Sequence, residues 1–199
     1  MEMFRSQRPD VRTSRGFSLL EVLIAVTVLG VGLSSLAALA TQTLNSTEYS
    51  RYLGLSGTLA SEKLEDLNRW SSSSSYVAAG GSLTSDTSAG GIDYFDDVSF
   101  SNTTGQVAET FSTVSGGTTT YTTYTHTANG QVNSSTSTTA PTVSTASGTV
   151  SFHRRWLIET NPTVNGVTIT GSRRVTVLVT LTNGVVEPAV SFQMSAVRP

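Results

Sequence analysis

The sequence predicts an α+β fold in which one long N-terminal helix packs on a C-terminal antiparallel β-sheet. Two observations lead to this prediction. Residues 17–70 contain no proline and carry first a continuous apolar run, then an amphipathic pattern with helical spacing. Residues 150–198 instead alternate apolar and polar side chains with a period of two, in runs separated by Asn-Gly pairs. The predicted segments are a leader (1–16), two halves of the helix (17–40 and 41–70), loops and strands (71–149), and the sheet (150–199).

The composition excludes several classes of protein. The chain has 199 residues, a formal net charge of −2 and only 13% charged residues, so nothing general favours binding to nucleic acid. It has no cysteine, which excludes disulfides and thiolate metal sites, and only 2 histidines. No P-loop, dinucleotide fingerprint, hydrolase elbow or zinc-binding helix motif occurs. We therefore expect a protein that is not an enzyme and needs no cofactor.

Residues 17–40 form the apolar half of the expected helix. As a helix this run is about 36 Å long, enough to cross a bilayer, and it exceeds the apolar core of a cleaved secretory signal peptide. The polar segment before it carries Arg5, Arg8, Arg12 and Arg15. By the positive-inside rule this leader stays in the cytoplasm, and the rest of the chain lies outside the inner membrane.

One carboxylate, Glu21, interrupts the apolar run. An ionised carboxylate in hydrocarbon costs ~2.5–3.5 kcal/mol on insertion scales, so it needs a partner or a function. In a first interpretation, Glu21 lies near the helix end and reaches the lipid headgroups. In a second, cleavage between Gly16 and Phe17 frees an α-amine at the membrane edge. Glu21 then pairs with the amine of a neighbouring subunit and sets the axial register of a stack of helices.

The segment RGFSLLEVLIA, residues 15–25, closely resembles the processing motif of type IV prepilins and the related pseudopilins. The resemblance implies that a membrane aspartyl peptidase, the prepilin peptidase, cuts after Gly16 and N-methylates Phe17. It also implies that Glu21 acts in methylation and fibre assembly, and that the fold is pilin-like. The partners it implies are this peptidase, inner-membrane lipid before assembly, and other pilins or pseudopilins through the N-terminal helix. The expected location is the inner membrane, with the head outside the cytoplasm, and then a pilus or pseudopilus.

Two glycines, Gly30 and Gly32, lie within the apolar run. Each costs about 1 kcal/mol relative to alanine inside a helix, so the pair marks a weak point. One interpretation is close packing against another helix in the bilayer. The other follows from the resemblance, which implies that pilin helices loosen at about this depth when the fibre assembles. The two interpretations are compatible.

Residues 41–70 continue the helix with an amphipathic pattern. The apolar stripe, at spacings i, i+4, i+7, i+11 and i+14, comprises Leu53, Gly57, Ala60, Leu64 and Leu67. The charged side chains, Lys63 among them, fall mostly outside this stripe. We therefore expect the stripe to pack on a sheet and do not expect charge pairs to hold the helix in place.

The middle of the chain, residues 71–149, is rich in serine and threonine and contains no lysine or arginine. Threonine-rich runs suit exposed strands, so we expect strands mixed with long mobile loops, with residues 134–139 the segment most prone to disorder. Asp93, Asp96 and Asp97 cluster in the sequence GIDYFDDV and could hold calcium, which some pseudopilins bind in the head. The preferred interpretation is an acidic, solvated loop without a metal.

Three strands are expected in residues 150–199. Their inward-facing residues are Val150, Phe152, Arg154, Trp156 and Ile158; Val175, Val177, Val179 and Leu181; and Val190, Phe192, Met194 and Ala196. His153, on the other face of the first strand, is expected to face solvent. Asn165-Gly166 and Asn183-Gly184 are expected to turn the chain. This part resembles, weakly, the C-terminal part of PilV-type minor pilins, the pilus-modification subgroup, but lacks the C-terminal cysteine pair of many major pilins.

Three functions are compatible with the sequence. The first is a minor type IV pilin, a structural subunit that helps to initiate or modify pilus assembly. The second is a minor pseudopilin of a type II secretion system, with the same leader and helix. The third is a single-pass anchored surface protein with a binding head, which requires neither cleavage at Gly16 nor a role for Glu21 and explains the least. The threonine-rich head favours the first.

Overall fold

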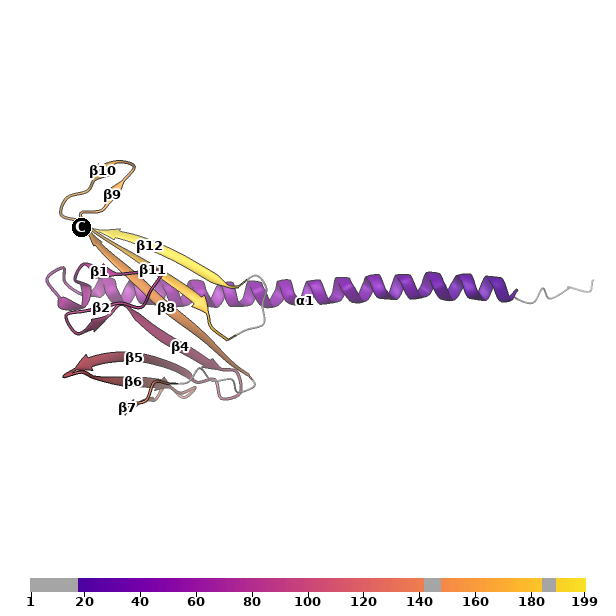
Figure 1. The fold of residues 1–199 in the computed structure, drawn as a ribbon, viewed down its shortest axis with the longest axis horizontal. Helices are drawn as coiled ribbons and strands as arrows, with labels where there is room; N and C mark the ends of the chain where they lie inside the picture. Colours follow the sequence, from indigo (N-terminus) through magenta and orange to yellow (C-terminus); the bar gives the residue numbers. More distant parts are fainter. Residues whose placement is uncertain (1–17, 142–147, 184–188) are drawn as a thin grey trace, which may run out of the picture. The chain divides into compact units, whose positions relative to one another are not determined.

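The structure, a computed structural model, describes residues 18–141, 148–183 and 189–199 (Figure 1). It contains one α-helix, α1 (Leu19–Arg69), a short 3-10 helix, η1 (Ser75–Val77), and twelve strands among the described residues. The chain divides into two compact units, Met1–Leu44 and Asn45–Pro199. The second unit holds the C-terminal part of α1 and all the strands, and the predicted α+β class, with the helix packed on an antiparallel sheet, is confirmed.

The second unit is built on one antiparallel sheet. The strands are β1 (Gly80–Gly81), β2 (Ser88–Ala89), β3 (Ile92–Asp93), β4 (Phe95–Ser101), β5 (Val107–Ser115), β6 (Thr118–His126), β7 (Val132–Ser137), β8 (Thr149–Thr160), β9 (Thr163–Val164), β10 (Val167–Thr168), β11 (Arg173–Leu181) and β12 (Ser191–Arg198). Eight of them form the main sheet in the order β12-β11-β8-β4-β5-β6-β7, with β1 beside the end of β8. The pairs β2–β3 and β9–β10 form two small sheets.

The three predicted C-terminal strands are confirmed as β8, β11 and β12. They are neighbours in the sheet, and Val177 at the centre of β11 lies opposite Trp156 on one side and Met194 on the other. The hairpin at Asn165-Gly166 is also confirmed: both residues have positive φ (50° and 80°), as a two-residue hairpin turn requires. The turn predicted at Asn183-Gly184 lies partly outside the described residues.

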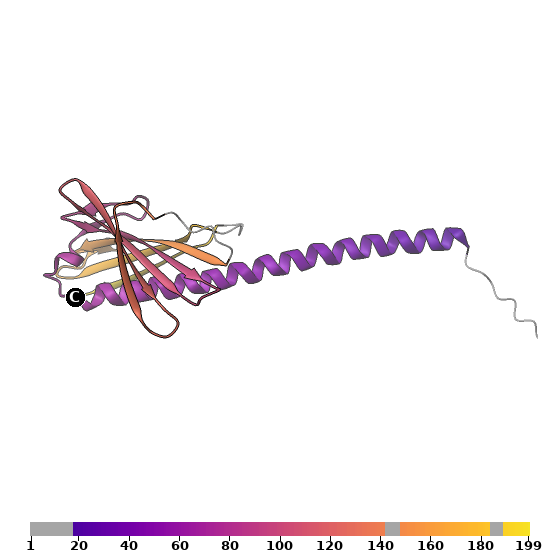
Figure 2. The ribbon, with the colours of Figure 1, turned by 90° about the horizontal axis from the view of Figure 1, so that it is seen from below.

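The serine- and threonine-rich middle of the chain is more regular than the sequence predicted. It contributes β4, β5, β6 and β7 to the main sheet, and β7 covers most of the segment 134–139 that was expected to be disordered. The physical reason is that β-branched threonine suits a pleated, half-exposed surface, and that continuous backbone pairing joins β5 to β6 and β6 to β7. In Figure 2 these strands run at an angle to β8 and β11, as the twist of a sheet produces.

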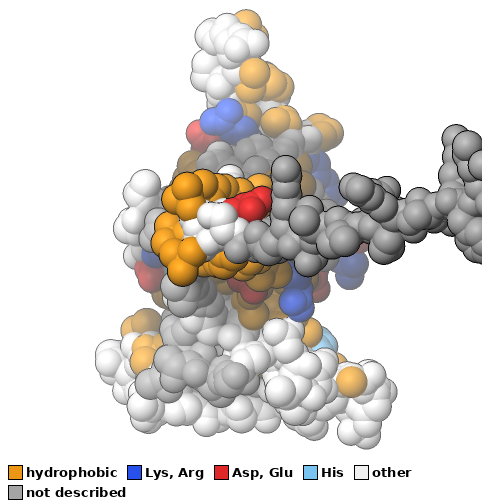
Figure 3. All heavy atoms as spheres, turned by 90° about the vertical axis from the view of Figure 1, so that its right-hand side faces the viewer, with side chains coloured by type: hydrophobic (Ala, Val, Ile, Leu, Met, Phe, Trp, Pro, Cys, Tyr) orange, Lys and Arg blue, Asp and Glu red, His pale blue; other side chains and the backbone are white. Residues whose placement is uncertain are grey.

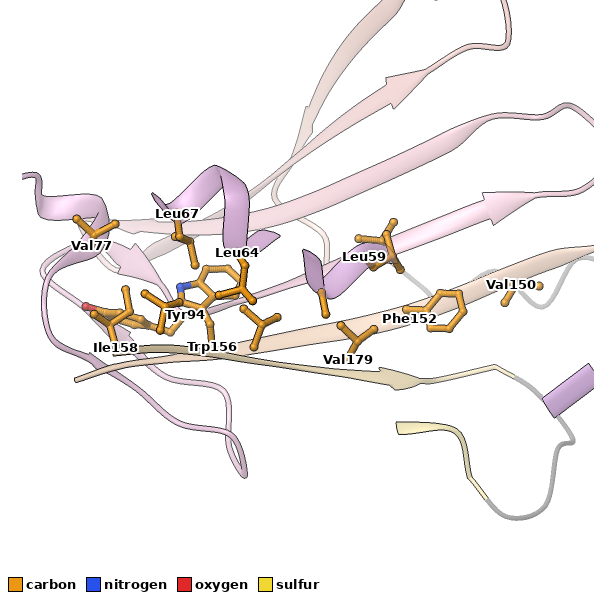
Figure 4. Packing of buried hydrophobic residues seen from close by; sticks show 14 residues of the cluster. Leu59, Leu64, Leu67, Val77, Tyr94, Val150, Phe152, Trp156, Ile158 and Val179 are labelled. Atoms are coloured by element: carbon orange, nitrogen blue, oxygen red, sulfur yellow. The ribbon is translucent and has the colours of Figure 1, made fainter. Parts of the chain in front are cut away.

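The core lies between the C-terminal part of α1 and the sheet. Leu59, Leu64 and Leu67 of the helix pack against β-strand side chains that include Phe152 and Trp156, and all five are at most 5% exposed (Figure 4). Burying a side chain of this size contributes roughly 1.5–3 kcal/mol, so this layer is the main source of stability of the head.

The buried face of the helix is rotated relative to the predicted stripe. The fully buried positions are Ser56, Leu59, Ala60, Lys63, Leu64 and Leu67. Leu53 and Gly57 of the predicted stripe lie at its margin and are only half-buried. Lys63, which was expected outside the apolar face, lies within it because a carboxylate and an aromatic ring of the sheet receive its ammonium group.

Candidate assembly site

The helix begins with a cap made by Ser18. The Ser18 hydroxyl accepts a hydrogen bond from the Leu20 N–H at 3.2 Å, and its carbonyl accepts from the N–H groups of Glu21 and Val22. Glu21 therefore lies in the first turn, where the unpaired N–H groups and the helix dipole favour a negative charge. This cap was not predicted from the sequence, although the spacing Ser-x-x-Glu is that of a capping box.

The Glu21 side chain has no hydrogen-bond or ion-pair partner among the described residues. Gly16 and Phe17, the predicted cleavage and methylation residues, lie outside them. The pairing of Glu21 with the α-amine of Phe17 on a neighbouring subunit stays a prediction. What the structure adds is a second role for the carboxylate, because a negative charge at this position also stabilises the start of the helix.

The first half of α1 is apolar on all sides. Every residue from 18 to 44 is exposed, and large side chains such as Leu19, Val31 and Leu44 are 67–83% exposed in the isolated chain. Figure 3 shows hydrophobic atoms all around the end of the helix, with acidic atoms on one side. Within the described residues, α1 is the one helix long and apolar enough to cross a membrane. A helix that is apolar all round needs lipid or other protein around it.

The hydroxyl groups in this apolar surface are satisfied within the helix. Thr27, Ser34, Ser35 and Thr41 donate to the carbonyl four residues earlier, at 2.8–3.1 Å. An unpaired polar group in hydrocarbon costs several kcal/mol, so these bonds allow the hydroxyls to sit in lipid or in a packed bundle.

Gly30 and Gly32 lie in an unbroken part of α1. A Cβ added at either position would meet no atom within 4 Å. Nothing inside the chain therefore requires glycine at these positions, and both interpretations, close approach of another helix and loosening during assembly, remain predictions.

Residues 11–37 match the family described as the prokaryotic N-terminal methylation motif. No curated protein and no solved structure matches the chain. The matched segment ends within the apolar half of α1 and includes Gly16, Phe17 and Glu21. Together with the fold, it supports a type IV pilin-like protein, either a pilin or a pseudopilin. It thereby supports a structural subunit that is anchored in the membrane, is processed by prepilin peptidase and assembles with other pilins.

The structure gives the three aspartates of the candidate calcium site separate partners. Asp93 accepts hydrogen bonds from Ser88 and Ser112, and Asp97 contacts His153. Asp96 and Asp97 follow one another in β4 and so point to opposite faces of the sheet. No group of three or more acidic, histidine or cysteine side chains in the described part of the chain is placed to hold a metal ion. The interpretation as a solvated acidic loop is wrong: the three aspartates lie in β3 and β4, and Asp93 and Asp96 are buried, with Asp96 only 1% exposed.

Asp96 is the centre of a buried ion cluster. Arg154, directly opposite on β8, donates from Nε to Oδ1 at 2.6 Å and from Nη2 to Oδ2 at 2.8 Å. Lys63 of the helix donates to Oδ2 at 3.0 Å, and its ammonium group lies 4.1 Å from the centre of the Trp156 ring. Burial acts to raise the pKa of Asp96, but the two cations hold it below its usual value. Burial likewise acts to lower the pKa of Arg154, and Asp96 raises it.

Neutralising Asp96 should destabilise the head strongly. Asp96→Asn keeps the shape of the side chain but leaves Lys63 without its counter-charge and Arg154 with only the longer contact to Glu109 at 3.4 Å, and we expect the free energy of unfolding to fall by about 3–5 kcal/mol. Denaturant titration of the full chain in detergent, followed by tryptophan fluorescence, measures this.

The matched control for Asp96→Asn is Glu65→Gln. Glu65 pairs with Arg69 at 3.2 Å on the outer face of the same helix, where both side chains are at least 70% exposed. An exposed pair of this kind contributes only ~0.3–0.5 kcal/mol. Equal losses in the two variants would show that the buried cluster does not hold the helix on the sheet.

His153 lies on the other face of β8 and is held between two carboxylates. Its Nδ1 is 2.6 Å from Asp97 and its Nε2 is 2.8 Å from Asp86, which also accepts a hydrogen bond from Arg155 at 2.7 Å. The histidine side chain is only 11% exposed, so the expectation that it faces solvent is wrong. The hydrogen bond to Asp97 raises the pKa of His153 against the opposing effect of burial, and Asp86 raises it further. Burial acts to raise the pKa of Asp86, but His153 and Arg155 lower it overall.

The stability of the head should therefore depend on pH through His153. Because its pKa is raised on folding, protonated His153 contributes fully below about pH 6.5, the value for an unfolded chain, and the contribution is lost as pH rises through the folded value. We expect the melting temperature to fall by about 2–4 °C from pH 6 to pH 8.5, since the partner carboxylates are half-exposed.

Thermal unfolding of the full chain in detergent, followed by circular dichroism across this range, checks the pH dependence. His153→Gln should flatten the response, whereas His126→Gln should preserve it, because His126 is exposed and makes no ion pair in the described structure. An unchanged pH response in His153→Gln would show that His153 does not cause the pH dependence of stability.

Proposed function

We propose that the protein is a minor type IV pilin that helps to initiate or modify pilus assembly. In this proposal prepilin peptidase cuts after Gly16, Phe17 becomes the methylated N-terminus, and the subunit enters the fibre through α1. The observation that carries the proposal is the methylation motif at residues 11–37 joined to a helix that is apolar on all sides and has one carboxylate in its first turn.

Assembly transfers the helix from lipid to protein. Before assembly, the apolar surface of residues 19–44 is buried in the inner membrane, and after assembly it is buried against neighbouring helices. Glu21 is the exception, because an ionised carboxylate in hydrocarbon costs ~2.5–3.5 kcal/mol unless it finds a partner. The new α-amine of Phe17 on a neighbouring subunit supplies a partner of opposite charge at one axial position only, so the pair favours one register. The sequence contains no nucleotide-binding motif, so the energy for extraction comes from other components.

The surface of the head favours a pilus over a secretion pseudopilus. Residues 71–152 contain no lysine or arginine, and β7, at one edge of the sheet, is exposed throughout with the sequence VNSSTS. In Figure 3 the lower part of the view, where β5, β6 and β7 lie, is mostly white, which marks uncharged polar side chains and backbone. Such a hydrophilic, weakly charged surface suits a subunit exposed on a fibre. A pseudopilin would share the motif and the helix, and the PilV-type assignment rests on the C-terminal sequence alone.

The N-terminus of the protein from native membranes tests the first step. Intact mass and N-terminal peptide mapping should show a chain that begins at N-methylated Phe17. A Gly16→Val variant should keep its leader, because a branched side chain at the cleavage position blocks processing in the proposed mechanism. A wild-type chain that still begins at Met1 in cells with active peptidase would contradict the proposal and favour a membrane-anchored surface protein.

Glu21 should be needed for incorporation but not for cleavage. We expect Glu21→Ala to be processed normally and to reach sheared fibres at a level at least about tenfold lower relative to the membrane pool, equivalent to about 1.4 kcal/mol. Immunoblots of fibre and membrane fractions measure this ratio. The control is Glu48→Ala, which removes an exposed carboxylate outside the apolar half of the same helix.

A second substitution separates the two roles of Glu21. Glutamine at this position can still take part in a capping box but has no charge to offer an amine. Glu21→Gln should therefore be as defective as Glu21→Ala if the charge sets the register. Normal incorporation of Glu21→Gln would leave only helix capping as the function of this residue.

A further inference from the structure

A cleft of about 560 Å³ opens in the head, within the Asn45–Pro199 unit. Its wall comes from the end of α1, from η1, and from strands β3, β4, β5, β6 and β8. Six aromatic side chains line it: Trp70, Tyr76, Phe95, Phe111, Tyr124 and Trp156. The volume lies within the range of pockets that bind small molecules, and both tryptophans of the chain are in its wall.

The outer aromatic rings are held in place but remain open to solvent. Trp70 and Tyr76 pack with ring centres 4.8 Å apart, and Phe111 and Tyr124 with centres 5.5 Å apart. Trp70 is 43% exposed, Tyr76 54% and Tyr124 39%. Aromatic rings of this size are more often buried, and here they offer flat apolar surfaces that a ligand reaches without any rearrangement of the core.

Polar groups lie between the aromatic rings. Ser112, Thr113 and Thr122 bring hydroxyl groups to the wall, and Asp66 and Asp93 bring carboxylates. The Trp156 indole N–H has no hydrogen-bond acceptor among the described residues, but it is buried behind the wall and so is not one of the groups that face the cleft.

The charges of the cleft disfavour anions, and its two inner aromatic faces are already occupied by a cation of the chain. Lys63, the cation in the wall, is already neutralised by Asp96 at 3.0 Å, whereas Asp66 makes no ion pair in the described structure. The cleft is therefore negative, which repels an anionic ligand. The Lys63 ammonium lies 4.1 Å from the centre of the Trp156 ring and 5.9 Å from that of Phe111, so these two faces are not free for a ligand cation.

We propose that this cleft binds a neutral saccharide. A sugar ring presents a flat face of C–H groups that packs on aromatic rings, and hydroxyls around its edge that both donate and accept hydrogen bonds. The exposed faces of Trp70, Tyr76 and Tyr124 match the first feature, and the hydroxyls and carboxylates of the wall match the second. This binding activity goes beyond the proposed role in assembly and gives the head a ligand of its own.

Tryptophan fluorescence of the full chain tests the proposal directly, because both reporters lie in the cleft. The protein is kept in a detergent without a sugar headgroup and titrated with neutral oligosaccharides of glucose, galactose, mannose and N-acetylglucosamine. Sialylated oligosaccharides serve as anionic probes and choline as a cationic probe. We expect a saturable change with at least one neutral series and none with the charged probes.

Aromatic substitutions locate the binding. Tyr76→Ala and Tyr124→Ala remove exposed rings and should each weaken binding about three- to tenfold. The matched control is Tyr121→Ala: Tyr121 lies three residues before Tyr124 on β6, points to the opposite face of the strand and is not part of the cleft wall. Binding should be unchanged in this variant.

Three outcomes would overturn the proposal. They are the absence of a response to every neutral series, a response to the charged probes alone, and equal weakening by Tyr121→Ala and Tyr124→Ala. Because the assay uses the isolated chain and requires neither cleavage nor a fibre, its failure would leave the proposed function in assembly intact. Failure of assembly in the Glu21 variants would likewise leave saccharide binding intact.

Discussion

The head of this protein depends on one buried carboxylate. Asp96 of β4 receives Arg154 from β8 and Lys63 from α1, so a single side chain joins two neighbouring strands and the helix that covers them. Apolar packing alone fixes the position of such a helix weakly, because the helix can slide until one leucine of the stripe occupies the site of another at little cost. An ammonium group that must reach one buried oxygen fixes both the rotation of the helix and its position along the sheet. The cluster is thus a specificity device more than a source of net stability, since a well-packed apolar trio of equal volume would be as stable or more so.

The cleft in the head follows from the same cluster. Lys63 is held by Asp96, and its ammonium group lies over the Trp156 ring, so the wall of the cleft is set by the position of the helix. The end of α1 then brings Trp70 beside Tyr76 of η1. A shift of the helix by one turn, about 5.4 Å, would break the ion pair and separate this wall from the strands β5 and β6. Because the side chains of such a rigid cleft are already ordered, less conformational entropy is lost when a ligand binds.

The sequence predicted the elements of this protein better than the contacts between them. The helix, the strands β8, β11 and β12, and the inward faces of these strands followed from apolar periodicity, because burial on one face leaves a regular pattern. The ion cluster did not follow, although two signals pointed to it. Arg154 stands in the apolar face of β8 between Phe152 and Trp156, and Lys63 is spaced by four residues from both Leu59 and Leu67. A cation in an apolar stripe requires a buried anion as its partner. No local sequence pattern indicates which aspartate provides that anion.

The middle of the chain was predicted only in part: strands were expected in its threonine-rich runs, but neither their pairing nor the strand at residues 134–137 was. Apart from Ser112, the residues of β5, β6 and β7 are half-buried or exposed, so these strands lack the apolar alternation that marks a strand over a core. Their stability comes from backbone pairing and from cross-strand contacts such as the hydrogen bond between Thr110 and Thr123 at 2.8 Å. Threonine and serine runs therefore carry little information on whether they pair, and the pairing depends on a long-range partner that the sequence does not mark.

The two units of the chain differ in where their side chains find partners. In the head, the buried charges of Asp96, Lys63 and Arg154 and most apolar side chains find their partners inside the chain. In residues 18–44 the leucines and valines are exposed, the two glycines meet no neighbour, and Glu21 has no partner in the described structure. Hydroxyls alone are satisfied there, and they bond to their own helix. Contacts within the chain do not explain the apolar composition of residues 18–44. It is explained by what surrounds this segment, lipid and other helices. The apolar half of the helix therefore depends on its surroundings for partners, whereas the buried groups of the head find theirs within the chain.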